Sequence, residues 1–194
     1  VRRQRQMCIR DRSLSAIFTA LCMKQNIPVW LAILVGLLSG ILMGLINGAL
    51  IHFTGINAFI ITLGTSFLYR GLALIVTRGT PVSKLPAAYR AFGGGDIFQV
   101  ESGVYMALLV LLLSIPLLYK MRWGHYITTL GGNPVALRRC GVRTGAWRIS
   151  TFAVMGFLAA LAGIIISARL NSAEPNAGLN MAVSYTHLRA HETA

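Results

Sequence analysis

The chain has 194 residues, of which 55% are hydrophobic and only 12% are charged, and its formal net charge is +13. Soluble domains carry about 25% charged residues, so this composition excludes an ordinary soluble domain. It indicates an all-α protein, a polytopic transmembrane helical bundle.

The two ends of the sequence differ from the rest. Residues 1–12 are rich in arginine without apolar periodicity, and residues 183–194 are polar. Both segments resemble translated adapter sequence and are set aside as non-native tails. We expect residues 13–182 to be a fragment of a transmembrane domain, and Ser13–Met23 to be the end of a helix that is too short to span.

Four apolar segments are long enough to cross a bilayer, which takes about 20 helical residues. They are Val29–Ile51, Ala58–Val76, Gly103–Tyr119 and Ile149–Leu170. Of the two longer connections, residues 120–148 contain six Lys and Arg and no acid, whereas residues 77–102 contain three cations and two acids. Because cytoplasmic loops carry the excess of Lys and Arg, residues 120–148 are predicted to be cytoplasmic and residues 77–102 external.

Small residues recur every four positions in the first span, as Gly36, Gly40, Gly44 and Gly48. This spacing favours close helix packing. Asn47 adjoins the stripe, and a polar amide in hydrocarbon needs a partner. It either joins two helices by hydrogen bonding, which is the commoner use, or contacts a transported substrate.

The second span carries polar residues at the same spacing, Thr62, Ser66 and Arg70. An ionisable residue within a span is by default a functional hypothesis. The alternative for Arg70 is that it reaches outward or binds carbonyls at the helix end. With Asn47, these three residues are the candidate translocation path.

Catalytic patterns are missing from the sequence. It contains no Ser/His/Asp set, no metal-binding cluster and no paired carboxylates, and the glycine-rich residues 93–96 lack the phosphate-loop pattern. We therefore expect no catalytic residue, no metal site and no cofactor bound by this chain. The cations lie in loops between apolar segments, which fits membrane topology better than nucleic-acid binding.

The basic connection contains a capped helix signal. Asn133 is a good N-cap, Pro134 suits the first helical position, and Gly141 suits a helix C-terminus. We predict a short helix over Pro134–Cys140, entered by a sharp turn at Gly131 and Gly132. Such a helix favours a protein-docking role over an ordinary topological loop.

This segment resembles the coupling loop of the inner-membrane permeases of ATP-binding-cassette (ABC) importers, and most closely their ribose/xylose-type monosaccharide branch. That branch has a pattern like G-G-N-x-x-A-A-x-x-x-G. The chain reads Gly131, Gly132, Asn133, Pro134, Val135, Ala136, Leu137, Arg138, Arg139, Cys140 and Gly141, and it departs from the family at Val135 and Leu137. Gly44–Gly48, Phe59–Gly64, Arg70-Gly71 and Ser167–Gly178 resemble further family motifs.

The resemblance implies a non-enzymatic permease subunit in a bacterial inner membrane. A periplasmic binding protein would deliver a monosaccharide, a cytoplasmic ATPase subunit would bind ATP and Mg²⁺ and receive the loop helix, and a second permease subunit would complete the path within membrane lipid. The alternatives are a permease for branched-chain amino acids or another small solute, a secondary transporter, and a structural membrane subunit. A secondary transporter is disfavoured because Asp96, Glu101 and Glu174 all lie in predicted loops.

Overall fold

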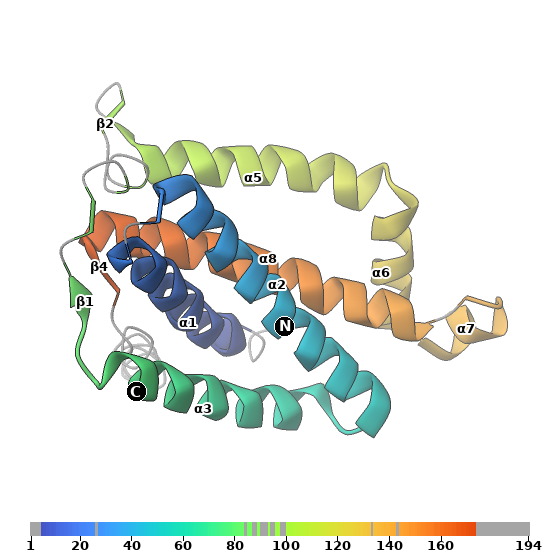
Figure 1. Cartoon of the computed structure of the whole chain (residues 1–194). Coiled ribbons are helices and arrows are strands. Elements are labelled where there is room, and N and C mark those ends of the chain that lie inside the picture. Colours follow the sequence, from blue (N-terminus) through green and yellow to red (C-terminus); the bar gives the residue numbers. More distant parts are fainter. Residues whose placement is uncertain are drawn as a thin grey trace, which may run out of the picture.

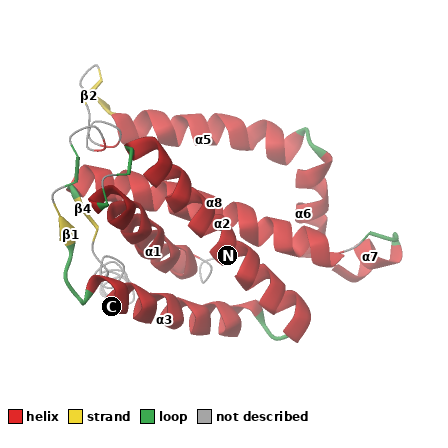
Figure 2. Ribbon diagram, in the orientation of Figure 1, coloured by secondary structure: helices red, strands yellow, loops and turns green. Residues whose placement is uncertain are grey.

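The computed structural model describes residues 5–25, 27–83, 85–86, 89, 93, 96–97, 100–132, 134–142 and 144–173, with the backbone alone for 5–12, 96–97, 100–101, 134 and 136. These residues form a helical bundle with four two-residue strands (Figures 1 and 2). The helices are α1 (Arg5–Lys24), α2 (Val29–Thr54), α3 (Ala58–Thr77), α5 (Ser102–Tyr119), α6 (Arg122–Gly132), α7 (Pro134–Arg139) and α8 (Thr144–Leu170).

The helices α2, α3, α5 and α8 are long and apolar enough to cross a membrane. This result confirms the predicted fold class and the four predicted spans. All four spans are longer than predicted: α3 and α5 each gain one residue, α2 continues to Thr54, and α8 begins at Thr144. The helix α2 ends where Gly55 adopts a left-handed backbone with φ of 65°. The helix α3 begins beside Asn57, whose side chain accepts a hydrogen bond from the Phe59 N–H at 3.2 Å.

The closest helix contact joins α2 to α8 through glycines, and we call Gly40, Gly44 and Gly48 of α2 with Gly156 of α8 the glycine seam. A Cβ added at Gly40 would lie 2.8 Å from the carbonyl oxygen of Gly156, and one added at Gly48 would lie 2.9 Å from the Cα of Ile149. Ordinary van der Waals contact begins at 3.4 Å. The two backbones therefore meet directly, with no room for a side chain between them.

Gly36 belongs to the same stripe but faces a different neighbour. Four residues turn an α-helix by 400°, so the stripe drifts by about 40° at each step. A Cβ at Gly36 would contact the Thr19 hydroxyl of α1 and would lie 3.2 Å from Cδ1 of Ile164 in α8. The stripe as a whole thus packs against two helices.

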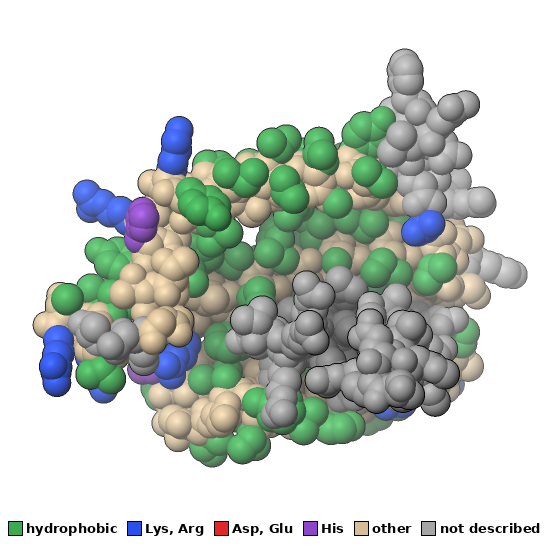
Figure 3. All heavy atoms as spheres, turned by 180° about the vertical axis from the view of Figure 1, so that it is seen from behind, with side chains coloured by type: hydrophobic (Ala, Val, Ile, Leu, Met, Phe, Trp, Pro, Cys, Tyr) green, Lys and Arg blue, Asp and Glu red, His purple; other side chains and the backbone are tan. Residues whose placement is uncertain are grey.

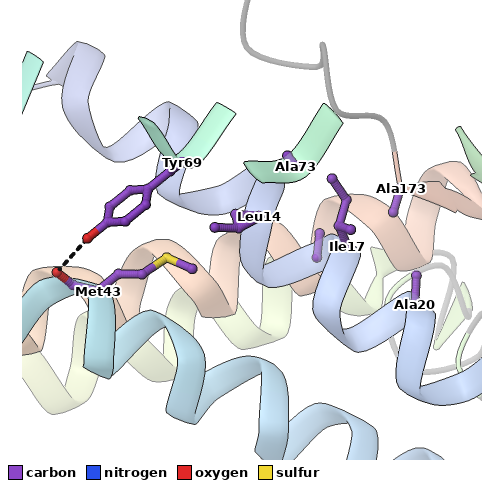
Figure 4. Packing of buried hydrophobic residues seen from close by; sticks show 8 residues of the cluster. Leu14, Ile17, Ala20, Met43, Tyr69, Ala73 and Ala173 are labelled. Carbon is purple, nitrogen blue, oxygen red and sulfur yellow. Dashed lines mark hydrogen bonds between the residues drawn. The ribbon is translucent and has the colours of Figure 1, made fainter. Parts of the chain in front are cut away.

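The helix α1 lies at the centre of the bundle and packs against α2, α3 and α8. Leu14, Ile17 and Ala20 are almost completely buried, and with Tyr69 and other residues they form the core cluster in Figure 4. Ser13–Met23 is therefore the C-terminal part of a longer helix, as predicted. It continues, without a break, a helix that starts at Arg5, within the segment that sequence analysis set aside as a tail.

The helix α5 lies apart from this core along the upper edge of the molecule in Figure 1. Ser102 is its one buried residue, and its contacts are concentrated at its two ends. At the first end, a Cβ on Gly103 would lie 3.3 Å from Cγ2 of Ile165 in α8. At the second end, the chain turns sharply into α6.

The two longer connections lie at opposite ends of the bundle, as their predicted placement on opposite sides of a membrane requires (Figure 1). At the end where α8 finishes, β1 (Val82–Ser83) pairs antiparallel with β4 (Ser172–Ala173), and β2 (Asp96–Ile97) pairs with β3 (Val100–Glu101). The helices α6 and α7 lie at the other end.

Tyr89 attaches the first of these connections to the bundle. Its side chain is fully buried, and its hydroxyl oxygen lies 3.0 Å from the carbonyl oxygen of Ile164 and 2.6 Å from the hydroxyl oxygen of Ser167. Burial raises the pKa of Tyr89 to about 12, and the hydrogen bond to Ser167 partly offsets that rise. The connection is thus packed onto α8 at this point.

Candidate functional site

The basic connection between α5 and α8 is helical over most of its length. After Tyr119 the chain changes direction within two residues and then runs across the end of the bundle (Figure 1). The N–H groups of Lys120 and Met121 both donate to the carbonyl oxygen of Pro116 at this turn. The turn also needs Gly124, where an added Cβ would contact the backbone oxygen of Leu118. The next helix, α6, therefore starts directly against the end of α5.

The helix α6 was not predicted from the sequence. Trp123, Tyr126, Ile127 and Leu130 are spaced as one helix face and are half-buried. The ring centroids of Tyr126 and Trp147 lie 4.7 Å apart, which packs α6 onto the first turns of α8. The periodic spacing of these apolar residues was the signal that could have identified the helix.

The helix α7 occupies the place where a short helix was predicted. Its end forms a Schellman motif, in which Gly141 N–H donates to Arg138 O at 3.1 Å and Val142 N–H donates to Leu137 O at 3.4 Å. Gly141 supplies the required left-handed backbone, with φ of 77°. The C-terminal cap predicted from Gly141 is therefore present.

The two faces of α7 differ in exposure. Leu137 is buried, whereas Val135, Arg138 and Arg139 are exposed, with 59% of the Val135 surface accessible. The helix thus anchors through one leucine and presents an apolar side chain and two cations outward. Asn133 lies outside the described residues, and the side chains of Pro134 and Ala136 are not described.

Gly131 and Gly132 differ from the prediction. They were expected to form a sharp turn, but they are the last two helical residues of α6, and the left-handed glycine of this region is Gly141. A Cβ added at Gly131 or Gly132 would meet no atom within 4 Å. Their surface is therefore open.

The polar residues of the second span lie on or near its buried face. Thr62 and Ser66 are buried, and their hydroxyls donate to Ala58 O and Leu63 O, each at 2.6 Å. Arg70 is half-exposed, and the buried stripe continues instead through Tyr69. The physical reason is the helix period: Arg70 lies eight residues after Thr62 and is therefore rotated by about 80° around the axis.

Asn47 is buried in α2, and its Oδ1 has no hydrogen-bond partner among the described residues. The Tyr69 hydroxyl lies 3.5 Å from the carbonyl oxygen of Met43 (Figure 4). Along the axis of α2, Asn47 lies about 6 Å from Met43 toward the C-terminus of the helix. Along the axis of α3, which runs antiparallel to α2, Ser66 lies about 4.5 Å from Tyr69 toward the N-terminus. Asn47 and Ser66 are therefore at similar heights on the two helices.

The comparisons with known proteins identify the family. The family described as "Branched-chain amino acid transport system / permease component" matches residues 13–187. The chain is 33% identical over 172 residues to the ribose import permease protein RbsC of Haemophilus influenzae, covering 87% of this chain and 53% of that protein. It is 34% identical over 168 residues to the D-allose transport system permease protein AlsC of Escherichia coli, covering 86% and 52%.

A third relative is the autoinducer 2 import system permease protein LsrC of Yersinia pestis, which is 35% identical over 139 residues, covering 72% of this chain and 38% of that protein. The chain spans about half the length of the ribose and allose permeases. No solved structure matches it. The chain belongs to the permease family named above.

Proposed function

We propose that this member of the permease family is part of the membrane subunit of an ATP-driven ABC importer for a monosaccharide. Two of the relatives described above are named for ribose and allose. The structure provides four helices that can span a membrane and a capped, outward-facing helix, α7, at one end. The proposal rests on one observation, that α7 is a short helix with a C-terminal cap and an exposed outer face.

We further propose that α6 and α7 face the cytoplasm of a bacterial cell. Exposed Lys and Arg side chains gather at the end of the molecule that carries these two helices (Figure 3). The positive-inside rule assigns such an end to the cytoplasmic side of the inner membrane. The opposite end, where β1 meets β4, would then face the periplasmic binding protein.

The proposed role of α7 is to dock on a cytoplasmic ATPase subunit. The exposed Val135 supplies an apolar contact, and Arg138 and Arg139 supply charge. A push on α7 would reach α8, with which α7 is in contact, and α8 is in backbone contact with α2 at the glycine seam. ATP and Mg²⁺ belong to the ATPase partner, and this chain supplies no catalytic residue.

The proposed substrate path runs beside Asn47, Thr62, Ser66 and Arg70. Burial of an amide oxygen without a hydrogen-bond donor costs free energy, which a passing sugar hydroxyl would recover. A sugar presents many hydroxyl donors, so this chemistry suits the proposed substrate class. A second permease subunit would close the path on the side that this chain leaves open.

The docking role is tested in the permease assembled with its ATPase and binding protein in liposomes. Gly132→Glu with Ala136→Glu should abolish stimulation of ATP hydrolysis by the loaded binding protein. A glutamate at Gly132 has open space around its Cβ, so that change does not overlap with the packing of α6. Thr54→Glu, which adds an exposed charge at the end of α2 and outside α6 and α7, serves as the control for added charge.

Stimulation that persists in the double variant would contradict docking through α7. Loss of stimulation in Thr54→Glu as well would show that the effect is not specific to this loop. Uptake of labelled ribose, allose and a branched-chain amino acid by the same liposomes would separate the substrate classes.

A further inference from the structure

The direction of α6 sets it apart from the spanning helices. It runs from the end of α5 across to the start of α8, whereas α5 and α8 run along the length of the bundle (Figure 1). If α5 and α8 cross the bilayer, α6 lies along its surface. The turn at Lys120–Met121 and the close approach of Gly124 to Leu118 place its first residues directly at the end of a span.

The two faces of α6 match an environment that is apolar on one side and aqueous on the other. Trp123, Tyr126, Ile127 and Leu130 form the half-buried face, and Arg122, His125, Thr128 and Thr129 are exposed. Tyr126 stacks with Trp147, and aromatic side chains are enriched at the level of lipid headgroups. These properties are typical of a helix in the membrane interface.

Charge identifies the chemistry that this surface attracts. From Ser102 to Ala173 the sequence contains no Asp or Glu, so the cations at this end of the bundle have no acid within their own segment. Lys120 and Arg122 are both exposed, and they lie at the junction of α5 and α6. Cations at such a position are attracted to anionic lipid headgroups.

The position of these two cations distinguishes lipid from protein as the partner. Lys120 and Arg122 border the end of a span, at the height where headgroups lie. Arg138 and Arg139 belong to α7, which extends beyond the end of the bundle (Figure 1). The two pairs of cations are thus at different depths, and the first pair is the one within reach of the bilayer.

We propose that α6 is an interfacial helix and that Lys120 and Arg122 form a binding site for the phosphate headgroups of anionic phospholipids. The inference depends on the membrane orientation of α5 and α8. It does not depend on the transported substrate or on the docking role of α7.

The test uses the permease assembled with its ATPase and binding protein, purified in micelles that contain phosphatidylglycerol and phosphatidylcholine. Native mass spectrometry measures the phosphatidylglycerol retained relative to phosphatidylcholine. We expect wild type to prefer phosphatidylglycerol and Lys120→Gln with Arg122→Gln to lose about fivefold in relative retention for each cation removed. Added salt should weaken the wild-type preference, because the charges are exposed.

Two matched variants complete the design. Lys24→Gln removes an exposed cation from the opposite end and should keep the wild-type preference. Lys120→Arg with Arg122→Lys keeps both charges and should also keep it, which separates loss of charge from misfolding.

Three results would overturn the proposal. Wild type with no preference, or the double Gln variant with the wild-type preference, would show that no such site exists. Loss of the ATPase from the double Gln variant with lipid retention unchanged would make this surface a protein contact instead. The measurement requires neither ATP nor sugar, so its failure is distinguishable from failure of the proposed transport function.

Discussion

The substitution Gly44→Ala tests whether the glycine seam holds the bundle together. An added Cβ would contact the backbone oxygen of Phe152 and would lie 3.0 Å from the carbonyl carbon of that residue and 3.1 Å from the Cα of Ala153. All three atoms are backbone, so no side-chain rotation can relieve the overlap. The helices α2 and α8 must separate by a few tenths of an ångström or more, and overpacking of this kind costs about 1–3 kcal/mol.

A matched control isolates the packing cost from the effect of helix propensity. Gly→Ala within a helix is intrinsically stabilising by up to about 1 kcal/mol, and this contribution is shared by every such change. Gly64 lies in the helix α3, and a Cβ there would meet no atom within 4 Å. The difference in unfolding free energy between Gly44→Ala and Gly64→Ala should therefore be about 1–3 kcal/mol, with Gly44→Ala the less stable.

The assay is unfolding of the purified permease in mixed micelles by increasing sodium dodecyl sulfate, followed by circular dichroism of the helices. Equal unfolding midpoints for the two variants would refute the reasoning, because they would show that α2 and α8 can separate without cost. A lower midpoint for Gly64→Ala would refute it as well.

Three further substitutions have distinct expected outcomes. Asn47→Leu removes a buried amide with an unpartnered oxygen, and it should raise the unfolding free energy by about 1–3 kcal/mol while sugar uptake falls. A lower unfolding free energy would show instead that the amide stabilises the contact between two helices. Tyr89→Phe should abolish a loss of stability between pH 10 and about 12, measured by circular dichroism, because burial keeps the phenol neutral in the folded state while the unfolded chain ionises near pH 10. An unchanged pH profile would contradict the burial of that hydroxyl. Gly124→Ala should lower the thermal unfolding temperature more than Gly131→Ala, because its Cβ contacts the backbone of Leu118 whereas that of Gly131 meets open space; equal shifts would contradict the tight turn.

The spans and the helix α7 could be predicted because their signals are local. A long apolar run needs only its own composition to be identified as a span, and the cap of α7 needs only a glycine at the right distance from its end. The helix α6 also had a local signal in Trp123, Tyr126, Ile127 and Leu130. It was not predicted because two consecutive glycines, Gly131 and Gly132, are typical of a turn and here lie at a helix end.

The remaining features depend on contacts between distant parts of the chain. Nothing near Tyr89 indicates that its hydroxyl meets Ser167, and nothing near Val82 indicates that it pairs with Ala173. The central position of α1 is of the same kind, since three other helices bury it. For the candidate path, a spacing of four residues drifts around the helix axis, and so the buried stripe of α3 that contains Thr62 and Ser66 continues through Tyr69 and not through Arg70.

The glycine seam also determines when the protein can complete its fold during synthesis. Gly44 and Gly156 are separated by α3, α5 and the helices that follow them, so the groove on α2 has no partner until α8 emerges from the ribosome. At usual rates of translation, the roughly 110 residues between them take about 5–20 seconds to synthesise. During that time α2 exposes a row of bare backbone to lipid or to an insertion factor. Nascent chains arrested before and after α8 should therefore differ in cross-linking at Gly44→Cys.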